Sequence, residues 1–168
     1  MLKSNDLINK VKSYNKFLNP ETLDKAYNFA VKAHENQKRH SGDPYVIHPV
    51  AVANILTELK LDSATIATGL LHDTIEDTHA TYQTIKQEFG QEVADLVEGV
   101  TKISELENQA KANSRAENFR KLIIATSKDI RVLLVKIADR LHNMRTIDSI
   151  DKQEKKERIA RETMEIYS

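Results

Sequence analysis

One stretch of the chain, ATIATGLLHDTIEDT at residues 64–78, constrains the fold more than any other. Its first half is apolar on nearly every side, and a helix without a polar face belongs in the centre of a helical protein. Asp62 and Ser63, directly before it, are residues typical of a helix start. The sequence therefore predicts a central helix around which the rest of the chain packs.

Most of the remaining chain repeats apolar residues at three- and four-residue steps, which is the spacing of an amphipathic helix. The chain has only 4 Gly and 3 Pro in 168 residues, which also favours helices over a turn-rich sheet fold. We expect an all-α fold, a single compact helical bundle over residues 1–168. The predicted helices span residues 20–35, 48–59, 63–78, 81–89, 91–100, 117–127, 130–145 and 151–165, with a mobile loop or frayed helix at 104–116.

One of these segments is ambiguous on its residue types. IRVLLVKIA (130–138) is rich in β-branched residues and would suit a strand by propensity alone. However, Leu133, Ile137, Leu141 and Met144 continue the apolar spacing at three- and four-residue steps, so we predict a helix.

Charge balance and residue usage narrow the class of protein. Lys plus Arg number 25, as do Asp plus Glu, and a net charge of zero argues against non-specific binding to long nucleic acid. The chain has no Cys, which excludes disulfides and thiolate metal sites. It shows neither the apolar core of a signal peptide nor an apolar run of about 18 residues that could span a membrane. We expect a cytoplasmic protein without a membrane partner.

The second half of the central stretch gathers four ionisable residues at the end of an apolar helix. On a helix His72 lies one turn from Glu76, and Asp73 lies one turn from Asp77. Burying such groups without partners costs on the order of several kcal/mol. A cation or a polar cleft should therefore receive them, and a solvated helix end is the alternative.

Two further positions could join this cluster. His48 opens a helix directly after a basic loop, and Asp139 interrupts an apolar run, with Asn143 one turn later. Each has an ordinary alternative: a histidine at a helix start, and an aspartate paired with a nearby Lys or Arg. With His72 and Asp73 they make an imidazole and carboxylate set that suits one divalent first-row ion.

Such an ion would acidify a bound water and orient a phosphoryl group. Glu76 and Asp77 would remain outside the ligand set and be free for proton transfer. Adjacent residues such as His72 and Asp73 can converge on one ion only near a helix end or an irregularity. The residue types alone leave manganese, zinc and iron open.

Six blocks of sequence, in this order, resemble the hydrolase domain of the RelA/SpoT alarmone enzymes. The likeness runs from about residue 20 to the last residue. It implies a helical fold of the HD phosphohydrolase type and hydrolysis of the 3′-pyrophosphate of guanosine 3′,5′-bis(diphosphate) to GDP and pyrophosphate, a step in the stringent response. The blocks are RHSGDPYVIHP, LLHDTIEDT, VEGVTK, AENFRK, DIRVLLVKIADRLHNMRT and RIARETMEIYS.

The resemblance also implies roles for individual residues. One Mn²⁺ per chain would be bound, by His48, His72, Asp73 and Asp139. Glu76 and Asp77 match the acidic pair tied to hydrolysis, Arg39 matches the residue that stacks on guanine, and Ser41, Asn143 and Thr146 match positions that line the nucleotide pocket. Lys38, Lys102 and Lys136 could add positive charge for the anionic substrate, although a solvated surface lysine is the simpler interpretation of Lys38 and Lys102.

The sequence departs from the family's pattern at two points. Position 40 is His where many relatives carry Lys, so a pyrophosphate contact from this loop is in doubt. The chain stops at EIYS, where the family continues into further helices and usually a synthetase domain, so we expect hydrolysis without alarmone synthesis. Two kinds of protein partner stay open: a second copy of the chain, in a homo-oligomer, or a separate synthetase.

Two other functions stay open. The chain could bind guanosine nucleotides or a partner protein with little turnover, or the same metal site could act on another phosphorylated nucleotide. The remaining histidines do not decide between them. His34 and His79 receive no role, and His142 points about 100° away from Asn143 on a regular helix, so at most it supports a ligand.

Overall fold

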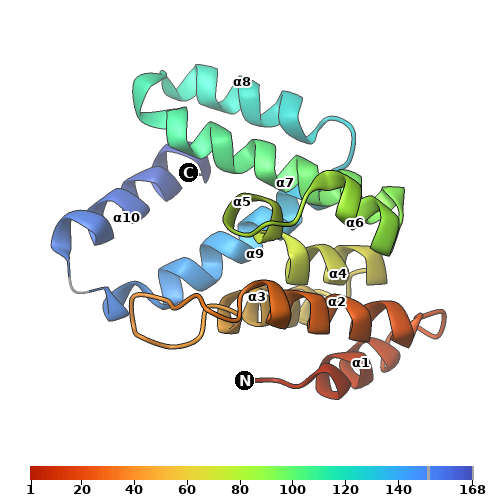
Figure 1. The fold of residues 1–168 in the computed structure, drawn as a ribbon. Helices are drawn as coiled ribbons and strands as arrows, with labels where there is room; N and C mark the ends of the chain where they lie inside the picture. The colour runs from red at the N-terminus through yellow and green to blue at the C-terminus, as the bar shows by residue number, and fades with distance from the viewer. Residues whose placement is uncertain (151, 168) are drawn as a thin grey trace.

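Helix α4 (Ser63–Leu71) lies at the centre of the fold, as its apolar sequence predicts (Figure 1). It packs against α2 (Pro20–Ala33), α3 (Ile47–Glu58), α7 (Gln91–Gln109) and α9 (Arg131–Arg145). All its residues from the third position onward are buried. The central helix therefore has no solvent face to accommodate polar side chains.

The structure is a computed structural model that describes residues 1–150 and 152–167, without the side chains of residues 111, 149, 165 and 166. The all-α prediction is confirmed, since the described residues form helices and one isolated bridge between Lys38 and Pro44. The further helices are α1 (Ser4–Lys12), α5 (Thr74–Asp77), α6 (Tyr82–Phe89), α8 (Arg115–Thr126) and α10 (Gln153–Tyr167), with 3-10 turns at Ala110–Ala112 and Ile147–Ser149.

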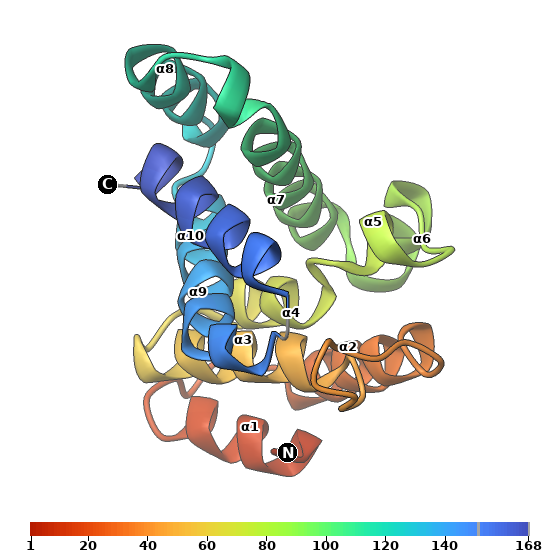
Figure 2. The ribbon, with the colours of Figure 1, turned by 90° about the vertical axis from the view of Figure 1, so that its left-hand side faces the viewer.

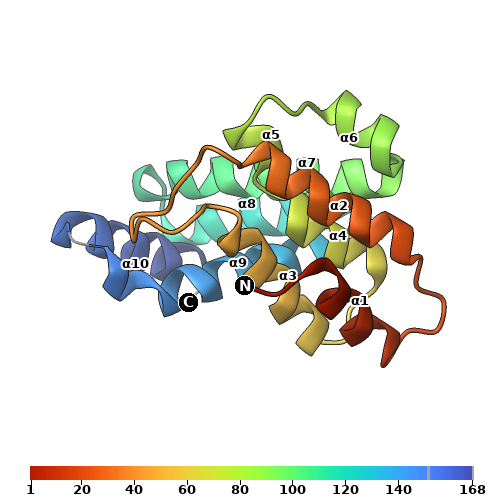
Figure 3. The same cartoon turned by 60° about the horizontal axis from the view of Figure 1, so that its bottom comes forward.

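The helices form two groups on either side of α4 and α9. Helices α1, α2 and α3 cover one side, α7 and α8 cover the other, and α10 runs beside α9 (Figure 2). The loop between α2 and α3 extends towards the connection from α9 to α10 (Figure 3). Among the helices of the described ranges, none combines the length and apolar character needed to cross a membrane.

A close approach of α3 and α4 depends on Gly69. A Cβ atom at this position would lie 2.7 Å from Cδ1 of Leu56 and 3.3 Å from the Cα of Ala53. A Cβ atom here would force the Leu56 side chain to shift and would press on the backbone of α3 at Ala53. Gly69 therefore lets the end of α4 pack closely against the middle of α3.

We predicted a mobile loop or a frayed helix at residues 104–116, and the loop is wrong because most of this segment is helical. Helix α7 continues to Gln109, a 3-10 turn follows, and α8 begins at Arg115. Ile103, Leu106 and Ala110 are buried, at three- and four-residue steps. The sequence analysis missed this apolar stripe because only three apolar residues form it, and most of the residues between them are polar.

The other predicted helices agree with the structure to within a few residues. IRVLLVKIA lies in and just before α9 and is helical, so its spacing predicted its structure better than its β-branched residues did. The tail helix is α10, although Asp151, where we predicted it to begin, lies outside the described residues. The central stretch does not form one helix: α4 ends at Leu71 and α5 starts at Thr74.

Candidate metal centre

The break between α4 and α5 places His72 and Asp73 at one point. The two residues form a turn, held by the Thr74 hydroxyl, which donates to the Leu71 carbonyl at 2.7 Å. His72 Nδ1 donates to the Gly69 carbonyl at 2.7 Å. This bond fixes the imidazole so that Nε2 faces away from α4, towards the side chain of Asp73.

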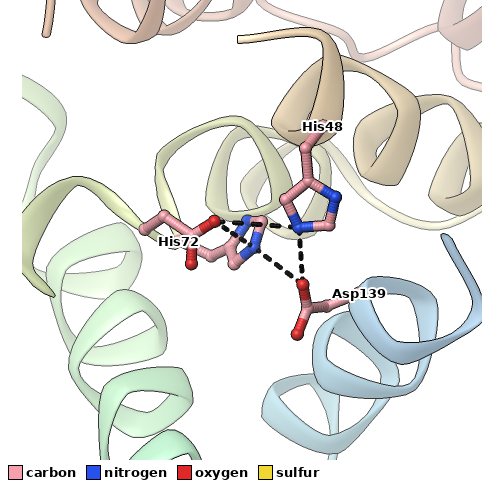
Figure 4. A group of neighbouring side chains, drawn as sticks. His48, His72 and Asp139 are labelled. Carbon is pink, nitrogen blue, oxygen red and sulfur yellow. Dashed lines mark hydrogen bonds and ion pairs between the residues drawn. The ribbon is translucent and has the colours of Figure 1, made fainter. Parts of the chain in front are cut away.

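His48 and Asp139 reach the same point from other helices (Figure 4). His48 comes from the first turn of α3, and its Nε2 lies 2.6 Å from Oδ1 of Asp139 on α9. His72 Nε2 lies 3.1 Å from Oδ2 of Asp73 and 3.3 Å from Oδ1 of Asp139. One donor atom from each of the four buried residues lies within 4.8 Å of the others, and we refer to the four as the His/Asp cluster.

The donor atoms of the His/Asp cluster fit a divalent ion. Two imidazole nitrogens and two carboxylate oxygens converge, a set that first-row divalent metals accept. Within the described residues, His72 Nε2 is buried and forms no hydrogen bond. Burial would lower the pKa of His72, but the carboxylates of Asp73 and Asp139 raise it well above its usual value. The cluster therefore attracts positive charge into a buried site.

Contacts from outside orient three members of the cluster. His142 Nδ1 lies 2.7 Å from His48 Nδ1, so one of these nitrogens donates to the other. Burial, together with His48, lowers the pKa of His142 to about 4, which keeps this imidazole neutral. The Tyr45 hydroxyl donates to Oδ2 of Asp73 at 2.7 Å, and Lys136 Nζ pairs with Oδ2 of Asp139 at 2.7 Å. Such contacts hold ligand side chains in one orientation.

Glu76 and Asp77 lie on α5, at the edge of a cavity of about 220 Å³ that His48, Asp73 and Asp139 also line. Both acids are more exposed than the cluster. Partial burial, and then the charge of Asp73, raise the pKa of both carboxyl groups. The structure thus places an acidic pair beside the cluster. The carboxyl groups of this pair face the cavity, where they can exchange protons with water or a bound ligand.

A second cavity, of about 190 Å³, adjoins the first and shares Tyr45 and Asn143 with it. Arg39 lies in this second cavity, where Nη2 donates to Oδ1 of Asn143 at 3.3 Å and to Oγ1 of Thr146 at 3.1 Å. Ser41 is not among the lining residues. Its exposed hydroxyl donates to Asp43 at 2.8 Å, so three of the four predicted pocket residues come together.

Comparison with known proteins places this arrangement in a family. Residues 26–168, which include the whole His/Asp cluster, match the HD domain. The chain belongs to the HD domain family. A divalent metal site is characteristic of this family, and the His/Asp cluster of this HD domain provides suitable donors.

The relatives of this HD domain are much longer proteins. It is 54% identical over 168 residues to a GTP pyrophosphokinase rsh of Brucella melitensis, covering 100% of this chain and 22% of the relative. It is 58% identical over 146 residues to the bifunctional (p)ppGpp synthase/hydrolase SpoT of Escherichia coli K12, covering 87% and 21%. The predicted likeness to RelA/SpoT enzymes is confirmed, and the chain spans about a fifth of their length.

A solved structure supports the fold of this HD domain. The structure of a metazoan ortholog of SpoT that hydrolyzes ppGpp superposes with a TM-score of 0.68, over 89% of this chain and 85% of that one. The two sequences are 23% identical, so this likeness shows a shared fold. The predicted helical fold of the HD type is confirmed.

Sequence reasoning missed several residues around the cavity of this HD domain. Tyr45, Glu107 and Arg140 all line the first cavity, but none was a predicted site residue. Tyr45 lies between the predicted helices 20–35 and 48–59, and Glu107 lies in the segment predicted to be a mobile loop or a frayed helix. Arg140 directly follows Asp139, and this position beside a candidate ligand was the one signal that could have drawn attention to it.

The three histidines His34, His79 and His142 lie outside the His/Asp cluster, in different surroundings. His34 is buried, and its Nδ1 lies 2.8 Å from Oε1 of Gln37, while its ring packs 4.8 Å from that of Tyr45. His79 is exposed in the turn after α5. His142 does contact His48, as described above, because the start of α3 lies against α9.

Proposed function

We propose that the chain hydrolyses the 3′-pyrophosphate of guanosine 3′,5′-bis(diphosphate), giving GDP and pyrophosphate. The observation that carries this proposal is that the buried His/Asp cluster and an acidic pair meet at one cavity, beside a second cavity that Arg39 lines. A nucleotide with a 3′-pyrophosphate would place those phosphates in the first cavity and its base in the second. The name of the Escherichia coli relative, a (p)ppGpp synthase/hydrolase, supports this substrate.

His48, His72, Asp73 and Asp139 would hold one divalent ion per chain, and we propose Mn²⁺. The two carboxylates suit this ion, and the resemblance to the RelA/SpoT enzymes favours it over zinc and iron, which imidazole donors suit as well. When bound, it would supply Lewis acidity to a phosphoryl oxygen and make water more acidic. The residues around the cluster keep its donor atoms aimed at one point: Tyr45 holds Asp73, His142 holds His48, and the Gly69 carbonyl holds His72.

Glu76 and Asp77 would carry out proton transfer. Water attacks the phosphorus attached to the 3′ oxygen, the bond between this phosphorus and the 3′ oxygen breaks, and the ribose oxygen takes a proton. Glu76 has a raised pKa, which brings it closer to the neutral range in which a general base or acid works best. In this scheme one carboxylate takes the proton of the attacking water and the pair passes a proton to the ribose oxygen.

Arg39, Asn143 and Thr146, which line the second cavity, would bind the nucleoside, whereas Ser41 lies outside this cavity and is left out of the proposal. The Arg39 guanidinium would stack on the guanine face, a contact of about 0.5–2 kcal/mol depending on desolvation. The Asn143 side chain offers both a donor and an acceptor to the base or ribose. Thr146 and Asn143 already accept hydrogen bonds from Arg39, which holds the guanidinium in the second cavity before substrate arrives.

The proposed reaction also suggests where the chain works and which protein partner it has. We propose that residues 1–168 form one hydrolase unit and that this unit works in the cytoplasm. A GTP pyrophosphokinase, the activity for which the Brucella relative is named, makes the kind of product that this unit would consume. The protein partner would be such a synthetase or a second copy of the chain.

Pyrophosphate release by the purified chain with Mn²⁺ tests this function. We expect Asp73→Asn to abolish the release, and Glu76→Gln to lower kcat by about 10²–10⁴-fold, the usual contribution of a general acid or base. Glu98→Gln is the matched control, because Glu98 is exposed on α7 and outside the cavity, and it should keep wild-type activity.

Two outcomes would contradict the proposal. The first is a wild-type chain that binds the nucleotide and Mn²⁺ but releases no pyrophosphate, which would indicate a binding module. The second is faster release of phosphate from another nucleotide in a panel assayed for both products, which would reassign the substrate.

A further inference from the structure

Lys136 lies deep in the wall of the first cavity, one helical turn before Asp139 on α9. Only 5% of its surface is exposed, which is rare for lysine. Its Nζ lies 2.7 Å from Oδ2 of Asp139, 3.0 Å from Oε1 of Glu107 and 2.9 Å from Oγ of Ser104. Three acceptors from two helices therefore surround one ammonium group.

These three contacts use the full donor capacity of the lysine. An ammonium group has three N–H donors and no acceptor, so each donor has one partner here. None remains for a substrate phosphate unless a partner leaves. The sequence suggested Lys136 as a source of charge for the substrate, but its contacts point inward, to Asp139.

The two oxygens of the Asp139 carboxylate have different partners. Lys136 holds Oδ2, while Oδ1 lies 2.6 Å from His48 Nε2 and 3.3 Å from His72 Nε2. If the ammonium were lost, the carboxylate could rotate about its side-chain bonds and turn Oδ1 away from the histidines. Lys136 thus holds Oδ2 of Asp139, while Asn143 Nδ2 adds a longer hydrogen bond of 3.5 Å to Oδ1.

Further ion pairs link Lys136 to helix α10. Glu107, which is 3% exposed, also pairs with Nη2 of Arg140. Arg140 Nη2 in turn lies 3.1 Å from Oε2 of Glu162 on α10, and the Tyr167 hydroxyl lies 3.4 Å from Oε1 of Glu107. Ser104, Glu107, Lys136, Arg140 and Glu162 form what we call the Lys136 network, which joins α7, α9 and α10.

We propose that Lys136 is a positioning residue for Asp139, and that the Lys136 network makes this positioning depend on the docking of α10. This inference rests on the proposed function only in taking Asp139 as a metal ligand. In a chain with α10 in place, Glu162 neutralises Arg140, Arg140 and Lys136 share Glu107, and Lys136 holds Asp139. When α10 shifts, the charges redistribute and the carboxylate of Asp139 loses its fixed orientation.

The sign of the effect on metal binding separates this role from a simple charge effect. A lysine close to a metal site repels the ion, so removing its charge would tighten metal binding if electrostatics alone acted. Loss of a group that orients a ligand weakens metal binding, typically by about 10–100-fold. The two explanations of Lys136 therefore predict opposite changes in the dissociation constant.

Calorimetric titration of the full chain with Mn²⁺, without nucleotide, measures this change. We expect Lys136→Met to weaken Mn²⁺ binding by about 10–100-fold relative to wild type. Lys102→Met is the matched control, because Lys102 is exposed on α7, and its Mn²⁺ affinity should be unchanged. An equal or tighter affinity in a folded Lys136→Met chain overturns the positioning role.

A second variant tests the link to α10 and does not depend on a buried substitution. Glu162 is partly exposed, so Glu162→Gln should fold, with thermal unfolding measured to confirm this. We expect its Mn²⁺ affinity to fall by about two- to fivefold, a typical size for coupling through contacting residues. The control Glu154→Gln, at the exposed start of α10, should not change the affinity. Equal affinities for Glu162→Gln and wild type overturn the link.

The result is separable from the proposed function. Wild-type chain that binds Mn²⁺ but releases no pyrophosphate would refute the hydrolase, and the metal titrations would still decide the role of Lys136. Conversely, active wild-type chain with unchanged affinity in Lys136→Met would leave the hydrolase standing and refute the positioning role.

Discussion

The His/Asp cluster and the Lys136 network lie side by side at one cavity, but different forces hold them in place. The cluster comes from the ends of α3 and α4 and from the middle of α9, three helices that pack through apolar side chains. The network joins α7, α9 and α10 through ion pairs among side chains that are almost all buried. The core sets the helix positions of the cluster, whereas charges hold the network, which in our proposal also orients the Asp139 side chain.

The difference predicts how each part responds to change. Apolar packing loses stability in proportion to the volume removed, and its neighbours partly relax. A buried ion pair behaves differently, because removing one partner leaves the other charge buried without compensation. The Lys136 network should therefore be the more fragile part, and the following substitutions compare the two.

Glu107→Gln should have the largest effect on stability, because Glu107 accepts from both Lys136 and Arg140. We expect the free energy of unfolding to fall by about 3–5 kcal/mol, the usual cost of breaking a buried ion pair from one side. Urea unfolding of the metal-free chain measures this. Glu105→Gln, two residues away on the exposed face of α7, is the control and should stay within about 0.5 kcal/mol of wild type. A loss for Glu107→Gln no larger than for this control would show that the network does not stabilise the fold.

Ile66→Val should have a smaller effect, because it removes one methylene from the apolar packing around α4. Ile66 is fully buried, and we expect the free energy of unfolding to fall by about 0.5–1.5 kcal/mol. Ile123→Val on α8 is the control: its side chain is largely exposed, so the change should stay within about 0.5 kcal/mol. The Mn²⁺ affinity should be unchanged in both variants. A large loss of Mn²⁺ affinity in Ile66→Val would contradict the distinction, because it would mean that core packing also sets the orientation of the metal ligands.

The same difference explains what could be predicted from the sequence. His72 and Asp73 stand out because they interrupt an apolar pattern, whereas their convergence with His48 and Asp139 was implied by residue chemistry and by the resemblance to the RelA/SpoT enzymes. The core helices were also predictable, since their apolar positions recur at regular steps. The irregularity expected near His72 is the break between α4 and α5, although the segment was expected to be one helix.

The parts that could not be predicted depend on contacts between distant residues. Glu107 and Arg140 lie on different helices, and their pairing depends on how α7 packs against α9. Tyr45 contacts Asp73 across 28 positions, from a loop whose path the sequence does not specify. Ser41 was expected in the pocket from a motif alone, and its hydroxyl instead bonds Asp43. Glu107 lies on the buried stripe of Ile103, Leu106 and Ala110, but only the fold brings its charged partners Lys136 and Arg140 to it.

Glu92→Gln should have the smallest effect and tests whether burial, and not charge removal itself, makes the Lys136 network fragile. Glu92 pairs with Nη1 of Arg131 at 2.8 Å, but its side chain is 62% exposed. Exposed pairs contribute about 0.2–1 kcal/mol, and Arg131 keeps Asp62 and Asp129 as partners. We expect a loss in this range by urea unfolding at low salt, shrinking at about 1 M salt because exposed charges are screened. The same carboxylate-to-amide change would then cost several-fold more at Glu107, so equal losses at the two positions would mean that burial does not set the cost.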